Sequence, residues 1–113
     1  MQPEIRACLH DVLQAIEEIE SFFAGQPLDF TRYQQDVRTR RATERNLEIM
    51  GEAVGRMLKF DPAFQLPNAR QIIATRNRII HGYDSVSDEM VWSIVVRHLP
   101  QLKQEVAALL AAE

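Results

Sequence analysis

Apolar residues recur every three or four positions along most of the chain, and this spacing restricts the fold more than any other feature. The first such series runs from Ile5 to Phe23 and stops before Gly25 and Pro27, two residue types that end helices. No segment alternates apolar and polar residues with a period of two, and none carries the turn dipeptides of a β-hairpin. The sequence therefore predicts an all-α protein.

The same spacing predicts three more helices: from near Thr31 to before Asp61, from near Asn68 to Gly82, and from Ser87 onward. Thr31 and Gln34 have the spacing of a capping box, Ser87 is a suitable helix cap, and Pro100 is expected to kink the last helix. Short connections favour antiparallel neighbours. We therefore expect one domain, residues 1–113, folded as an up-and-down bundle of four or five helices.

Composition narrows the class of protein. The 113 residues are 46% hydrophobic and 26% charged, which is typical of a soluble globular domain. Cys8 is the single cysteine, and no apolar run approaches the roughly 20 residues that cross a bilayer, so a cytoplasmic protein without a membrane segment is expected. The three histidines fall on three different predicted helices without paired carboxylates, so neither a metal site nor another cofactor is expected.

The charges are unevenly distributed. The net charge is −3. However, residues 38–45 contain four arginines (Arg38, Arg40, Arg41 and Arg45) and one acid, Glu44, and residues 69–83 contain three arginines and no acid. Two basic segments thus stand out from an acidic background. Arginines gathered in this way suit contact with a phosphate backbone, although a solvated helix face explains them equally well.

The segment RNRIIHGY, residues 76–83, interrupts an apolar helix face with polar residues. At about 100° per residue, Arg76 lies within the stripe formed by the isoleucines of this helix, Tyr83 would return to the Arg76 side, and His81 falls roughly 140° away. A straight helix keeps Arg76 and His81 apart. They can act together only if the helix unwinds near Gly82 or if a second subunit contributes its own copy.

Taken singly, these residues have ordinary structural explanations: a histidine favours a helix C-terminus, an arginine extends to solvent, and a tyrosine packs. Together, the pattern Arg76-Asn77-x-x-x-His81-x-Tyr83 resembles the RX4HXY signature of HepT-like toxins, members of the HEPN superfamily of helical ribonucleases. Residues 44–56 and 76–106 are similar to that family's second-helix segment and to its motif, turn and last helix. The similarity covers about two-thirds of the chain.

The resemblance implies a homodimeric, metal-independent RNA endonuclease that acts as the toxin of a toxin-antitoxin pair. It implies that Arg76 and His81 are catalytic, that Asn77 assists, and that Tyr83 receives AMP from an MntA-like minimal nucleotidyltransferase antitoxin (AMPylation).

The chemistry of RNA cleavage suits these residue types. RNA carries its own nucleophile, the 2′-hydroxyl, so cleavage can proceed without a metal ion if histidines exchange protons near pH 7 and an arginine stabilises the phosphorane. A single site has only one motif histidine, and two motifs facing one cleft of a dimer would provide two. Four arginines are candidates for guiding the RNA backbone: Arg40, Arg41, Arg45 and Arg78. Two alternatives use the same segment: a non-catalytic helical partner of a nucleotidyltransferase that binds a nucleotide, and a purely structural dimerisation bundle.

Overall fold

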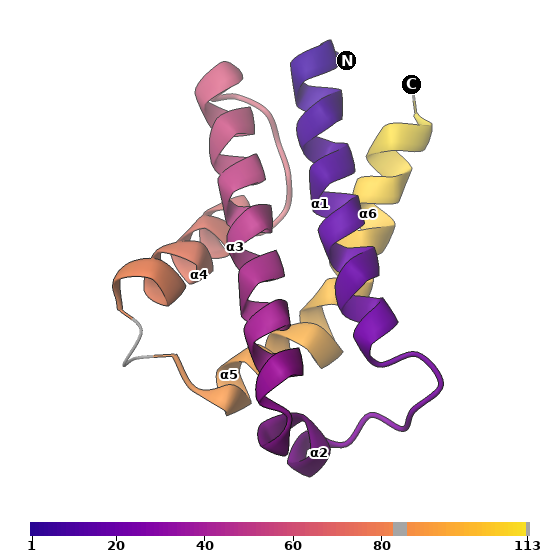
Figure 1. The fold of residues 1–113 in the computed structure, drawn as a ribbon. Coiled ribbons are helices and arrows are strands. Elements are labelled where there is room, and N and C mark those ends of the chain that lie inside the picture. Colours follow the sequence, from indigo (N-terminus) through magenta and orange to yellow (C-terminus); the bar gives the residue numbers. More distant parts are fainter. Residues whose placement is uncertain (83–85, 113) are drawn as a thin grey trace.

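The structure is a computed structural model that describes residues 1–82 and 86–112. Its elements are α1 (Pro3–Phe22), α2 (Phe30–Gln35), α3 (Val37–Phe60), α4 (Ala69–His81), α5 (Asp88–Ser93), the π-helical turn η2 (Ile94–His98) and α6 (Leu99–Ala111) (Figure 1). The described residues form helices and connecting turns and contain no strand. The predicted all-α bundle is confirmed.

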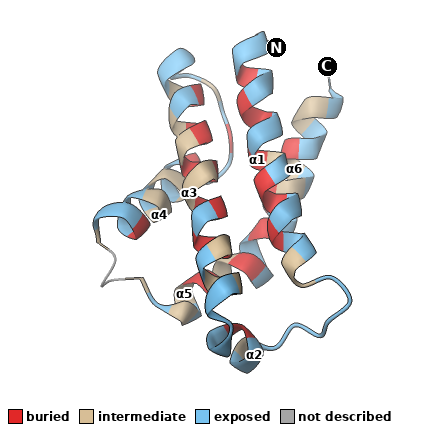
Figure 2. Ribbon diagram, in the orientation of Figure 1, coloured by how far each residue is buried: buried red, intermediate tan, exposed pale blue. Residues whose placement is uncertain are grey.

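Most of the core lies between α1, α3 and α6. In Figure 2 the buried residues of α1 and α3 line the facing sides of the two helices, and α6 packs along α1. The predicted stripe is buried from Ile5 to Ile19: Ile5, Leu9, Val12, Ile16 and Ile19 are each at most 1% exposed, while Phe23, just beyond α1, is half-buried. Complete burial of one such side chain contributes about 1.5–3 kcal/mol, so this row fixes the arrangement of the bundle.

The expected single helix from Thr31 to the Asp61 region is wrong in one respect, because it breaks at Asp36 into α2 and α3. The Asp36 carboxylate accepts hydrogen bonds from the Thr39 backbone N–H at 3.0 Å and from the Thr39 hydroxyl at 2.6 Å. Asp29 caps α2 in the same way and takes the place expected for Thr31. An aspartate side chain that accepts hydrogen bonds from the following backbone N–H groups favours the start of a new helix. Asp36 therefore divides the predicted helix even though the apolar spacing continues past it.

The last helix also differs from a simple kink at Pro100. Ser87 caps α5 as predicted and accepts a hydrogen bond from the Met90 N–H at 3.1 Å. The helix then widens into η2, and Pro100 stands in the first turn of α6. Proline lacks an N–H and its ring collides with the carbonyl four residues earlier, so a widened turn before Pro100 relieves that conflict.

α4 packs against α3, buries Ile79 of the motif segment in the core, and ends at the connection that leads to α5 (Figure 1). It starts after Asn68, whose φ of 61° is in the left-handed region that asparagine tolerates. Within the described part of the chain, no helix is both long and apolar enough to cross a bilayer. The fold thus presents the motif helix on the flank of the core, packed against α3.

Candidate active site

Arg76 is held at the crossing of α4 over α3. Its side-chain stem lies over Gly51, where a Cβ would stand 2.2 Å from Arg76 Cβ and 2.8 Å from Arg76 Cγ. Only a residue without a side chain permits this approach. Arg76 is half-buried, which agrees with its predicted place within the isoleucine stripe of α4.

The guanidinium of Arg76 is oriented by its neighbour. Arg76 Nη1 donates a hydrogen bond to Asn77 Oδ1 at 2.9 Å, while Arg76 Nε is buried without a hydrogen-bond partner among the described residues. A buried donor left unpaired costs about 1–3 kcal/mol, which is the situation expected of a group that awaits an acceptor. The arrangement can present a planar cation to an anionic ligand.

His81 is the last residue of α4 and is exposed. Because α4 remains helical through His81, the two side chains leave the helix about 140° apart and about 7.5 Å apart along its axis. The predicted separation of Arg76 and His81 within one chain is therefore confirmed. Exposed Asn77 lies one turn before His81 on the same side of α4, whereas Ile80, 39% exposed, lies one turn beyond Arg76. Tyr83 lies outside the described residues.

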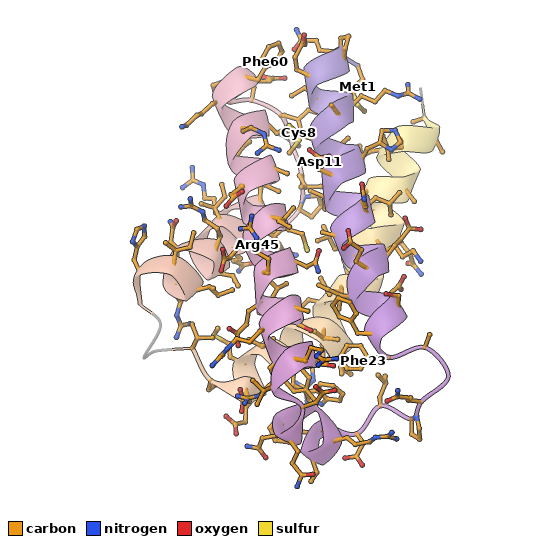
Figure 3. The ribbon with its side chains drawn as sticks, in the orientation of Figure 1. Met1, Cys8, Asp11, Phe23, Arg45 and Phe60 are labelled. Carbon is orange, nitrogen blue, oxygen red and sulfur yellow. The ribbon has the colours of Figure 1, made fainter. Side chains whose placement is uncertain are left out.

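The three arginines of α3 that were candidates for RNA contact are paired with acids. Arg40 bridges to Asp88 of α5 at 3.4 Å, with only 20% of its side chain exposed. Arg41 bridges to Glu44 at 3.4 Å, and Arg45, which projects from the middle of α3 in Figure 3, lies 3.1 Å from Glu48 and 3.6 Å from Glu52. Arg41 and Arg45 keep 53% and 59% of their side chains exposed, and Arg78 is exposed on α4.

Two buried titratable groups near the start of α3 were missed by the sequence analysis. Burial raises the pKa of Glu44, which is only 7% exposed, with Arg41 acting in the opposite direction. Burial also raises the pKa of Tyr33, whose hydroxyl has no hydrogen-bond partner in the part of the chain that the structure describes. Glu44 precedes Gly51 by seven residues, or about two helical turns, so both lie on the same face of α3. This spacing was the sequence signal that could have indicated the burial of Glu44.

Among residues 1–82 and 86–112, no three histidine, cysteine or acidic side chains are grouped so that they could hold a metal ion. The polar groups that α4 does bring together are a half-buried guanidinium, the carboxamide that orients it, and an exposed imidazole at the helix end. Guanidinium and imidazole are phosphate-binding and proton-transferring groups, respectively. An all-α bundle that carries these groups on one helix has the chemical groups needed to bind a phosphodiester.

Comparison with known proteins makes the class specific. The family model "Ribonuclease HepT-like" matches residues 12–109, and the chain belongs to this HepT-like ribonuclease family. It is 33% identical over 97 residues to the "Probable ribonuclease HepT" of Thermococcus cleftensis, covering 84% of this chain and 86% of that protein. It is 30% identical over 105 residues to "Putative RNase MJ1380" of Methanocaldococcus jannaschii, covering 91% and 94% respectively. No solved structure gives a significant match.

Proposed function

We propose that this chain is a metal-independent RNA endonuclease in which Arg76 and His81 are the catalytic residues. The observation that carries the proposal is the guanidinium of Arg76, fixed by Gly51 beneath it and by Asn77 beside it, on the same helix that ends in an exposed His81. Membership of a ribonuclease family supports RNA as the substrate.

The reaction follows from these groups. A neutral imidazole of His81 removes the proton from the 2′-hydroxyl, and the 2′-oxygen attacks the adjacent phosphorus. Arg76 stabilises the negative charge of the phosphorane. The bond from phosphorus to the 5′-oxygen then breaks, and an imidazolium protonates the leaving oxygen. The products are a 2′,3′-cyclic phosphate and a free 5′-hydroxyl.

Cleavage by this route uses two imidazoles, and each chain has one in the motif. We therefore propose a homodimer whose two α4 helices face one RNA-binding cleft. Since α4 stays helical to His81, a second subunit is the remaining way to bring an imidazole near each guanidinium. The exposed Ile80, which lies one helical turn beyond Arg76, supplies apolar surface for such a contact.

Toxin activity and its control form the second part of the proposal. In this account an MntA-like nucleotidyltransferase antitoxin transfers AMP to Tyr83, two residues beyond His81. The added group blocks RNA through its bulk and its negative charge. Exposed Arg41, Arg45 and Arg78 guide the RNA backbone, whereas Arg40, held by Asp88, contributes mainly through its charge.

Incubation of the purified protein with labelled single-stranded RNA in the presence of EDTA tests the central claim. We expect fragments ending in 2′,3′-cyclic phosphates, and loss of cleavage in His81→Ala and in Arg76→Ala. His10→Ala, which removes an exposed histidine on α1, is the matched control and should cleave normally. Binding of nucleotide without any cleavage would instead favour a non-catalytic partner of a nucleotidyltransferase.

A further inference from the structure

A cleft of about 360 Å³ opens between α3, α4, η2 and α6, outside the group formed by Arg76, Asn77 and His81. Its apolar lining comes from all four elements: Leu47, Met50, Ile72, Ile94, Leu99 and Leu102. Its volume falls in the range of pockets that hold a small planar ligand. Ile94 and His98 belong to η2, and π-helical turns often occur at functional sites.

The polar rim of the cleft is rich in hydrogen-bond acceptors. Gln101 Nε2 donates to Glu105 Oε1 at 3.2 Å, and the Thr75 hydroxyl donates to the Gln71 carbonyl at 2.9 Å. These contacts use hydrogens of Gln101 and Thr75 within the protein, and the contact from Gln101 orients the Glu105 carboxylate. Each carboxylate oxygen has two lone pairs, so Glu105 can accept from Gln101 and still accept from a ligand with both oxygens, while the carboxamides of Asn68 and Gln71 can donate.

This combination matches one nucleobase better than the others. Guanine has two adjacent donors, N1–H and the N2 amino group, which a carboxylate can accept together, and a neighbouring acceptor, O6, for a carboxamide donor. Adenine, cytosine and uracil do not present two adjacent donors on that edge. The apolar lining and the flat imidazole of His98 can cover the faces of the base, as in other proteins that bind unpaired RNA bases.

We propose that this cleft binds an unpaired guanine of the RNA substrate, with Glu105 as the residue that selects it. The inference rests on the proposed RNA cleavage and adds a sequence preference to it. On α4, Gln71 and Thr75 lie about 80° and about 120° around the helix from His81, and about 15 Å and about 9 Å from it along the helix axis. The selected base therefore belongs to a nucleotide outside the cleaved linkage.

Cleavage of short single-stranded RNAs that differ only in one base, placed at successive positions on either side of the cut, tests the proposal. We expect a preference for guanine at one flanking position, and an approximately tenfold fall of that preference in Glu105→Gln. Glu18→Gln, an exposed glutamate of α1, should keep the preference. Equal cleavage of all the RNAs by the wild-type protein, or an unchanged preference in Glu105→Gln, would overturn the proposal.

Binding of mononucleotides separates this inference from the proposed reaction. In calorimetric titrations, GMP should bind more tightly than AMP or CMP, and Glu105→Gln should remove the difference while His81→Ala retains it. If the protein cleaves no RNA but keeps this selectivity, the nuclease proposal fails and the guanine site stands. If Glu105→Gln leaves nucleotide binding unchanged but lowers the mass of an oligomer in light scattering, a protein occupies the cleft and the guanine site is wrong.

Discussion

Gly51 of α3 lies directly against the stem of Arg76 of α4, so closely that the Cβ of any other residue would be 2.2 Å from Arg76 Cβ. The same Cβ would stand 3.2 Å from the Ile72 carbonyl oxygen, so backbone as well as side chain would be in the way. The distance between the two helices, and with it the position of the guanidinium, depends on the absence of one methyl group.

Gly51→Ala should therefore lower both stability and activity. Separation of α3 from α4 costs about 1–3 kcal/mol, as for other overpacked contacts, and moves Arg76 from its position. We expect a lower midpoint in urea unfolding and slower RNA cleavage at temperatures where the variant remains folded.

Gly55 provides the matched control one turn later in α3. A Cβ there would meet nothing within 4 Å. Because alanine is the better helix former, Gly55→Ala should stabilise the protein by about 0.5–1 kcal/mol and leave cleavage unchanged. Equal stability and activity in Gly51→Ala and Gly55→Ala would show that the crossing does not position Arg76.

The hydrogen bond from Arg76 to Asn77 predicts an order of activities. Asn77→Ala frees the guanidinium and should slow cleavage about tenfold, the effect of one lost orienting contact. Asn77→Asp can still accept the hydrogen bond, but its negative charge neutralises the positive charge of Arg76 and repels RNA. It should therefore be the slower of the two.

Ionic strength provides the check on that explanation. Salt screens the charge of an exposed side chain, so the gap between Asn77→Asp and Asn77→Ala should narrow as salt rises from about 50 to about 500 mM. A gap that stays constant, or an Asn77→Asp variant faster than Asn77→Ala, would exclude the electrostatic role assigned to Asn77.

Residue patterns within single segments predicted the helices and the polar motif, but they could not predict which residues of different helices are in contact. The isoleucine spacing of α4 correctly placed Arg76 in an apolar face and His81 away from it. The contact with Gly51 joins residues 25 positions apart, and nothing in either segment alone identifies the other. The break at Asp36 was missed because the apolar repeat continues across it, although an aspartate followed by a threonine three residues later is a capping signal.

Glu44 predicts a pH dependence of stability. Burial raises its pKa in the folded protein above that of the unfolded chain, so the folded state binds the proton more tightly. The free energy of unfolding therefore falls as the pH rises from the pKa of the unfolded chain, about 4.3, through the higher pKa of Glu44 in the folded protein. Glu44→Gln removes this contribution, so the variant should gain stability relative to the wild-type protein over that interval.

Urea unfolding at several pH values between about 4 and 7 measures the effect. The curve of Glu44→Gln should be flatter than that of the wild-type protein, and the difference should be largest at the upper end. Glu18→Gln, at an exposed position of α1, should follow the wild-type curve. A wild-type protein that instead gains stability relative to Glu44→Gln as the pH rises would mean that Arg41, not burial, dominates at this carboxyl.

Phenylalanine substitutions at Tyr83 and Tyr33 distinguish the proposed AMP acceptor from a tyrosine that is buried in the core. Tyr83→Phe removes the hydroxyl that the proposed antitoxin modifies, yet it removes no group that the cleavage reaction uses. The variant should therefore cleave RNA and resist a nucleotidyltransferase supplied with ATP. Tyr33→Phe is the matched control: the Tyr33 side chain is 2% exposed, and its hydroxyl has no partner among the described residues. Loss of that unpaired hydroxyl should leave the stability unchanged or raise it slightly, and the nucleotidyltransferase should still inhibit RNA cleavage by Tyr33→Phe.

Mass spectrometry should detect added AMP on the wild-type protein and on Tyr33→Phe but not on Tyr83→Phe. Neutralisation of Tyr83→Phe that still requires nucleotide transfer would place the modified group elsewhere in the chain.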